Sequence, residues 1–147
     1  MRLVMILAAL VGMPTLAAAE TWRSVGWAGE KPQRYFYFVD VDSVTRDGNM
    51  VTFWEQESLE ADEADGSNRV FNFRRGNCAN LSTQILRTRT QKNAQVIARD
   101  DTPGQWVEHP EGSMMGDGMK MICGRADYDS GPLADPDAHA RQYFRTH

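Results

Sequence analysis

Hydrophobic and polar residues alternate through most of the chain, and this pattern predicts a β-sheet. In "NRVFNFRRGNC", Phe71 and Phe73 fall on one side of an extended chain. Asn72 and Arg74 fall on the other. Six segments rich in aromatic and β-branched residues are typical of strands, and a shorter one is typical of an edge: 21–27, 34–40, 49–57, 68–78, 81–91, 95–99 and 105–109. Turn residues separate these segments, so we predict a mainly antiparallel sheet.

The stretch "YFYFVDVDSVTRDGNMVTFW" allows two interpretations, a calcium-binding loop or a β-hairpin. A calcium-binding loop that started at Asp40 would need glycine at its sixth position and glutamate at its twelfth, where this chain has Thr45 and Val51. The flanks are also strand-like rather than helical. Asp47 and Gly48 tolerate the positive φ of a tight hairpin turn, so we predict a hairpin.

Toward the C-terminus the spacing of apolar residues becomes helical. Ser113 is a suitable N-cap for this helix. The apolar residues that follow recur at helical intervals: Met115, Met119, Ile122 and Cys123. Two glycines weaken the helix, so we expect it to form by packing on the sheet. Its methionines form either a pliable packing face or contacts to a cofactor, and the packing interpretation is favoured.

The first 19 residues have the pattern of a secretory signal. A basic start precedes a short apolar run, and Ala17 and Ala19 form an A-x-A cleavage motif before Glu20. The apolar run is too short to span a bilayer, and no later segment is long and apolar enough to do so. Glu20 occupies the place where a bacterial lipoprotein has its lipidated cysteine. We therefore expect a mature chain that is soluble and has no lipid anchor.

The mature chain is long enough for one domain with a core of its own. We expect this domain to cover residues 20–124 and to be followed by a polar tail at 125–147. Within the tail, "DPDAHARQYF" allows either a short helix, with Asp135 as N-cap and Pro136 in its first position, or a loose segment.

The sequence contains no recognisable catalytic or metal-binding motif. It has no G-x-S-x-G and no phosphate-binding loop. The histidines at 109, 139 and 147 do not have zinc-ligand spacing, and we expect them to be solvated. The net charge of −4 does not indicate a nucleic-acid binder. We therefore expect a non-enzymatic protein without a metal or a cofactor.

Charged residues are strongly segregated in the middle of the chain. Residues 55–65 hold six acidic residues and no basic one. Residues 66–99 hold seven basic residues and no acidic one. The functional interpretation is a basic surface that attracts an anionic partner, such as an acidic protein or a sulfated glycan. The alternative is a solvated sheet face that the neighbouring acidic stretch partly neutralises.

Three of these arginines fall on adjacent predicted strands. Strict alternation along "LSTQILRTRTQ" places Arg87 and Arg89 on the face of Thr83 and Ile85. With Arg74 from the preceding strand, they are expected to line one face of the sheet. The candidate partner-binding residues are Arg74, Arg87, Arg89 and Lys92.

The chain has two cysteines, Cys78 and Cys123, and both lie in the part that we expect to be exported. In an oxidising compartment an isolated pair of cysteines most often forms a disulfide. The C-x-x-C spacing of redox enzymes is absent. We therefore predict a disulfide between Cys78 and Cys123.

Three stretches in this order resemble the bacterial surface-adhesin protein E-like family over residues 22–124. They are "YFYFVDVDSVTRDGNMVTFWEQE", "VFNFRRGNC" and "WVEHPEGSMMGDGMKMIC". The resemblance implies an α+β fold, with a sheet of about six antiparallel strands and a helix held across one face. It also implies that the Cys78–Cys123 disulfide is the tether between helix and sheet.

The family's named member is an outer-membrane adhesin that binds host matrix and serum proteins. The resemblance therefore implies an exported binding protein of the bacterial envelope. The alternative is a periplasmic small-ligand carrier, with a cleft between the methionine-rich helix and the sheet, or an envelope-housekeeping protein. Because the chain lacks the lipidation cysteine, we expect it in the periplasm, with the cell surface and the medium as the other locations.

Overall fold

The computed structural model describes residues 20–147, so the predicted secretory signal lies outside the described residues. The strands are β1 (Trp22–Ala28), β2 (Tyr35–Asp47), β3 (Met50–Leu59), β4 (Arg69–Asn77), β5 (Ser82–Lys92), β6 (Gln95–Asp100) and β7 (Val107–Glu108), and the helices are α1 (Met114–Ile122) and α2 (Pro136–Thr146). The part of the chain that the structure describes contains no helix long and apolar enough to cross a membrane.

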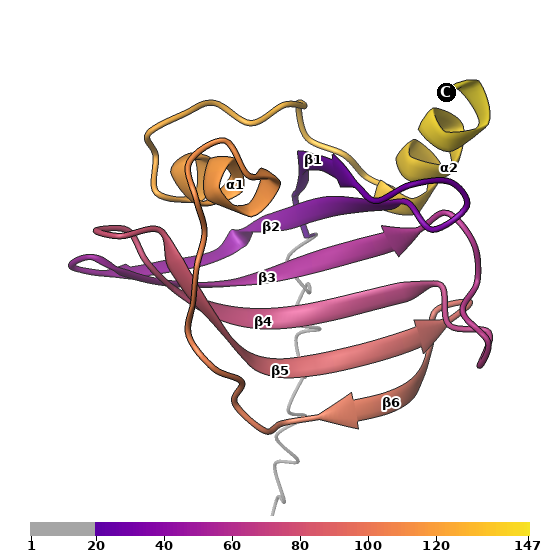
Figure 1. Cartoon of the computed structure of the whole chain (residues 1–147), viewed down its shortest axis with the longest axis horizontal. Helices are drawn as coiled ribbons and strands as arrows, with labels where there is room; N and C mark the ends of the chain where they lie inside the picture. The colour runs from indigo at the N-terminus through magenta and orange to yellow at the C-terminus, as the bar shows by residue number, and fades with distance from the viewer. Residues whose placement is uncertain (1–19) are drawn as a thin grey trace, which may run out of the picture.

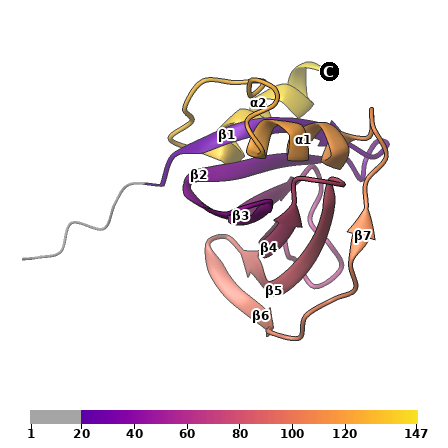
Figure 2. The same ribbon diagram turned by 90° about the vertical axis from the view of Figure 1, so that its left-hand side faces the viewer.

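The predicted antiparallel sheet is confirmed. Strands β1 to β6 lie in chain order, each paired with the next (Figure 1). β6 pairs with the C-terminal half of β5, and the short β7 pairs with the N-terminal half of β5. The chain between β6 and α1 runs around one side of the sheet and carries β7 (Figure 2).

The hairpin prediction is confirmed at the turn between β2 and β3. Asp47, predicted as a turn residue, pairs with Met50 at the end of β2, so the loop consists of Gly48 and Asn49, one residue later than predicted. Gly48 has a φ of 58°, a value that glycine adopts without strain and that two-residue hairpin loops require.

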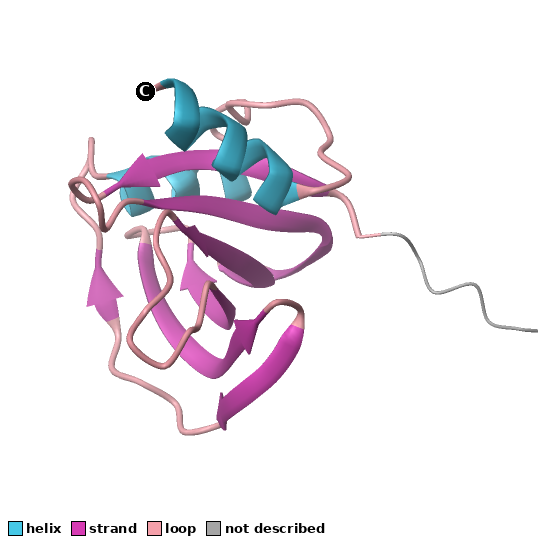
Figure 3. Ribbon diagram, turned by 90° about the vertical axis from the view of Figure 1, so that its right-hand side faces the viewer, coloured by secondary structure: helices cyan, strands magenta, loops and turns pink. Residues whose placement is uncertain are grey.

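The two helices cover opposite faces of the sheet. The side chains of successive strand residues point to opposite faces, and each face carries its own apolar cluster. On the α1 face the main buried residues are Val39, Val51, Phe53, Met119 and Ile122. On the α2 face they are Trp22, Phe36, Phe38 and Ala140, with Tyr143 and Phe144 packed against them. Both helices lie toward the β1 end of the sheet (Figure 3), and they leave the β5–β6 end without a helix over it.

Helix α1 packs closely on the sheet. Ser113 Oγ accepts a hydrogen bond from the Gly116 backbone N–H at 3.1 Å and so caps the helix. Met119 is fully buried against the sheet, which confirms the packing role of this methionine. A Cβ at Gly76 would lie 2.6 Å from Met119 Cε, so the glycine in β4 makes room for the helix.

A disulfide joins Cys78, which follows β4, to Cys123, the C-cap residue of α1. Their Cα atoms are 5.8 Å apart. The predicted link between helix and sheet is confirmed.

The C-terminal segment forms α2 rather than a loose tail. Asp135 Oδ1 accepts a hydrogen bond from the Ala138 backbone N–H at 2.9 Å, and Pro136 is the first helical residue. The buried Asp137 then joins the helix to the sheet. It accepts hydrogen bonds from Ser58 Oγ at 2.6 Å and Gln56 Nε2 at 2.8 Å.

Candidate functional site

The α2 face of the sheet continues over β3 to β6 as an open surface. Trp54 pairs with Phe73, which pairs with Arg87. Phe71 pairs with Arg89. Paired residues on neighbouring strands point to the same side of a sheet. We call this surface the arginine–aromatic face, and it comprises Trp54, Phe71, Phe73, Arg75, Arg87, Arg89 and Arg99.

Aromatic rings and guanidinium groups lie against each other across this face. The ring centroids of Trp54 and Phe73 are 5.1 Å apart. The guanidinium carbon of Arg87 lies 5.7 Å from the Phe73 centroid, and that of Arg75 lies 5.3 Å from the centroid of Trp106. The contact with Phe73 leaves Arg87 accessible, since 55% of its side chain is exposed, whereas 19% of the Arg89 side chain is exposed.

The arginine–aromatic face also contains a hollow of about 310 Å³. Trp22, Trp54, Phe71 and Arg89 line it, and Glu20 also contributes. Trp22 and Phe71 meet edge to face, with ring centroids 5.9 Å apart. The hollow is large enough for one side chain of a binding partner, and its aromatic walls offer apolar contact.

The face has an excess of positive charge. Arg89 Nη2 donates a hydrogen bond to Asp101 Oδ1 at 2.7 Å, and Arg87 Nε lies 4.0 Å from the same oxygen. Arg75 and Arg99 form no ion pair within residues 20–147. Two of the four guanidinium charges, those of Arg75 and Arg99, therefore have no carboxylate partner in this part of the chain.

Arg74 does not belong to this surface, so the prediction that Arg74, Arg87 and Arg89 share one face is wrong. Arg87 pairs with Phe73, but the next residue of β4, Arg74, pairs with Ile85. Leu86 is thus an extra residue that forms a β-bulge. The bulge reverses the alternation in β5 and turns Arg87 and Arg89 to the side opposite Arg74.

Arg74 instead belongs to a buried polar network on the α1 face. Its Nε lies 2.5 Å from Glu55 Oε1, and the Glu55 residue is 1% exposed. Asn72 Nδ2 donates hydrogen bonds to Glu55 at 2.9 Å and Glu57 at 3.1 Å. The network is closed to a ligand at Glu55, because this carboxylate is covered by protein.

Burial changes the titration of this network. It raises the pKa of Glu57, and the charge of Glu55 raises it further. Burial also raises the pKa of Tyr37, opposite Glu57 in the register, and the charges of Glu57 and Glu55 raise it further. His109 was expected to be solvated, but it is half-buried, and its Nε2 lies 2.8 Å from Thr83 Oγ1. Burial lowers the pKa of His109, so the ring is kept neutral.

Lys92 lies apart from the arginine–aromatic face. It ends β5, and its ammonium group lies beside Gly66 in the loop after β3, where a Cβ would be 2.4 Å from Nζ. Hydrogen bonds from Ser67 lower the pKa of Asp65 in this loop, and the charge of Lys92 adds to that effect. Lys92 therefore interacts with the acidic stretch of its own chain.

Three other carboxylates of the acidic stretch interact with parts of the chain outside the arginine–aromatic face. Glu55 and Glu57 belong to the buried network. Glu60 pairs with Arg34, whose Nη2 lies 2.6 Å from Glu60 Oε1. These carboxylates therefore do not neutralise the arginine–aromatic face.

Sequence reasoning selected Arg74 as a site residue and missed its neighbour Arg75. Both belong to the basic run, so composition could not separate them. The alternation of Phe71 and Phe73 against Asn72 and Arg74 already indicated that Arg74 faces away from the aromatic rings.

The fold and the site define a small domain, an antiparallel sheet with a disulfide-linked helix and an open basic surface. The pattern of the surface-adhesin protein E family matches residues 22–124, from the start of β1 to just beyond α1 and both cysteines. The chain belongs to this family, and the resemblance stated above is confirmed. Family membership supports a surface adhesin-like protein. Among curated proteins, none matches the chain.

Proposed function

We propose that the protein is an exported, non-enzymatic binding protein of the bacterial envelope, and that its arginine–aromatic face binds an acidic protein partner. The observation that carries the proposal is the group of four arginines beside Trp54, Phe71 and Phe73, of which Arg87 and Arg99 are exposed. Tryptophan and arginine are enriched among the residues that dominate protein–protein binding energy. The hollow beside Trp54 offers a place for a side chain of the partner.

The polar network on the α1 face supports a non-enzymatic role. Glu55, Glu57 and Tyr37 are the kinds of groups that acid–base catalysis uses. In this chain they bind one another and Asn72, and protein covers Glu55. Their perturbed pKa values follow from burial in a structural network.

The proposal can be tested by surface plasmon resonance against immobilised acidic proteins and sulfated glycans. We expect an acidic protein to bind, with affinity that falls as salt rises from about 50 mM to about 200 mM. Arg87→Glu with Arg89→Glu should weaken binding more than about tenfold and reduce its salt dependence. Arg141→Glu with Arg145→Glu, on exposed positions of α2, is the control with the same change of charge.

If the Arg87/Arg89 variant and the parent bound with equal affinity, the arginine–aromatic face would not be the binding site. Binding to sulfated glycans alone would replace the protein partner by a glycan. Protease treatment of intact bacterial cells that produce the protein tests its location. Digestion indicates surface exposure, and protection indicates the periplasm. Protection would contradict a role in adhesion to host cells.

A further inference from the structure

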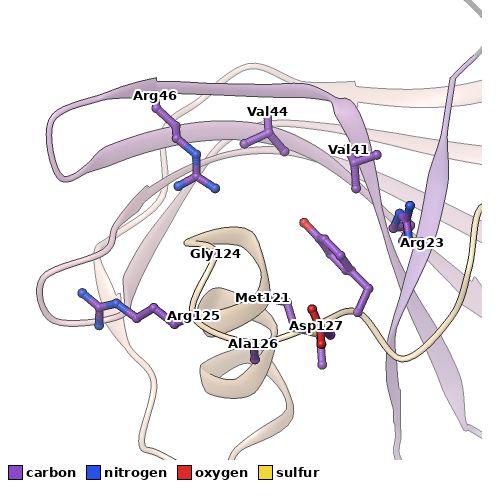
Figure 4. Close-up of a pocket in the computed structure, with 10 residues that line it drawn as sticks. Arg23, Val41, Val44, Arg46, Met121, Gly124, Arg125, Ala126 and Asp127 are labelled. Atoms are coloured by element: carbon purple, nitrogen blue, oxygen red, sulfur yellow. The ribbon is translucent and has the colours of Figure 1, made fainter.

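A second cavity lies at the C-terminal end of α1, away from the arginine–aromatic face (Figure 4). Its volume is about 860 Å³, within the range of small-molecule sites. Its walls come from β1, β2, α1 and the segment at 124–128. Its lining includes two arginines, a tyrosine and three apolar residues: Arg23, Arg46, Tyr128, Val41, Val44 and Met121.

A wide bulge in β2 builds one wall of the cavity. Asp40 pairs with Trp54 and Thr45 with Thr52, so residues 41–44 lie opposite a single residue of β3. Ser43 holds the bulge together. Its Oγ donates a hydrogen bond to the Asp40 carbonyl at 2.7 Å and accepts one from the Trp54 backbone N–H at 2.8 Å.

Two arginines of the cavity are held in place by backbone carbonyls. Arg46 Nη2 donates a hydrogen bond to the carbonyl of Ile122, the last residue of α1. Arg23 Nη1 donates one to the Ser130 carbonyl at 3.3 Å. Neither forms an ion pair within the described part of the chain. A guanidinium has five N–H donors, so most remain free. Figure 4 shows the Arg46 guanidinium directed into the cavity.

Tyr128 completes the polar part of the cavity. Its ring lies 5.8 Å from the guanidinium carbon of Arg23. Burial raises the pKa of Tyr128, while the charges of Arg46 and Arg23 act in the opposite direction. The phenol therefore remains a neutral hydrogen-bond donor near two cations. Arg125 adds a third cation to the lining, and Asp127 is its single carboxylate.

The apolar part of the cavity consists of Val41, Val44 and Met121. Figure 4 shows Val44 and Val41 side by side along β2, next to Arg46. A ligand that satisfies both parts needs an anionic head and an apolar body. A metal cation or a neutral sugar would leave the arginines without a partner.

We propose that this cavity binds a small amphipathic anion, with a carboxylate or phosphate head on Arg23 and Arg46 and an apolar body on Val41, Val44 and Met121. The head group interacts with two guanidinium groups that hydrogen bonds to backbone carbonyls already hold in position. The site is independent of the acidic-protein site, because the two share no residue.

Isothermal titration calorimetry with four probes tests the proposal: octanoate, octyl phosphate, inorganic phosphate and octanol. We expect octanoate, octyl phosphate or both to bind, and the pattern identifies the head group. Inorganic phosphate and octanol should each bind at least about tenfold more weakly, since each lacks one half of the ligand. Absence of binding by both octyl anions at about 1 mM would overturn the proposal. Equal binding of inorganic phosphate or octanol would also overturn it.

Arg46→Gln and Arg23→Gln should each weaken binding of the octyl anion by about tenfold to a hundredfold. Arg87→Gln, on the arginine–aromatic face, is the matched control and should bind like the parent. Because Arg46 also contacts α1, a thermal melt must show that its variant is folded. NMR of the parent needs no variant: the methyl signals of Val41, Val44 and Met121 should shift on titration. Shifts elsewhere alone would contradict the proposed location.

Discussion

Arg74 and Arg75 are consecutive residues of β4, and they lie in opposite regions of the molecule. Arg74 points to the α1 face, is 8% exposed and pairs with Glu55 at 2.5 Å. Arg75 points to the arginine–aromatic face and lies over Trp106 without an ion pair in the described chain. The difference shows that consecutive arginines of the basic run have different surroundings. Arg74 neutralises a buried carboxylate, whereas Arg75 lies on the surface for which we propose a partner.

The largest expected effect distinguishes these two arginines by stability. Arg74→Ala leaves Glu55 buried without its cation, which should lower the free energy of unfolding by about 3–5 kcal/mol. Arg75→Ala is the control and should change it by less than about 1 kcal/mol. Urea denaturation measures both. Equal losses of stability would mean that Arg74 and Arg75 contribute equally to the free energy of unfolding despite their different burial.

The disulfide stabilises the α1 side of the sheet. Cys78→Ser should lower the free energy of unfolding by about 2–4 kcal/mol, because the link constrains the unfolded chain. Binding at the arginine–aromatic face should survive in the folded variant, since that surface lies on the opposite side. Urea denaturation and surface plasmon resonance provide the two measurements. A variant as stable as the parent would contradict the role of the tether.

The close packing of α1 can be tested at Gly76. An added Cβ would lie 2.6 Å from Met119 Cε, so Gly76→Ala should lower the free energy of unfolding by about 1–3 kcal/mol. Gly104→Ala is the control, because its Cβ would have no neighbour closer than 3.8 Å. Thermal denaturation compares the two variants. An equally large loss at Gly104 would indicate a backbone effect rather than contact with the helix.

The smallest expected effect is the pH dependence of the buried network. Burial raises the pKa of Glu57 above its usual 4.5. The folded protein therefore binds this proton more tightly than the unfolded chain does. The resulting stability is complete below pH 4.5 and is lost as the pH rises through the raised pKa.

Glu57→Gln removes this titration. The parent should lose more stability than the variant between pH 4.5 and neutral pH, as measured by urea denaturation across that interval. Glu63→Gln, in the exposed loop, is the control and should follow the parent. Parallel curves for the parent and Glu57→Gln would show that Glu57 titrates normally.

Local sequence patterns predicted most of the elements, because their signals act over a few residues. The predicted strand at 68–78 became β4 (Arg69–Asn77), and that at 81–91 became β5 (Ser82–Lys92). The strand at 34–40 was predicted too short, since β2 continues through its bulge to Asp47. The pattern of aromatic residues did not show that the segment between Asp40 and Thr45 forms a bulge within this strand.

The sequence by itself determined the antiparallel character of the sheet, the hairpin at Gly48 and the pairing of Cys78 with Cys123. Tertiary structure decided which arginines meet. Successive side chains of a strand point to alternate faces of the sheet. The single extra residue Leu86 shifts this alternation by one residue and so changes the face on which Arg87 and Arg89 lie. The sequence of β5 alone carries no signal for this bulge, because its position depends on pairing with β4. The cavity beside α1 also required the tertiary structure, since Arg23, Arg46 and Tyr128 are far apart in the chain and meet only when the sheet and the helix pack together.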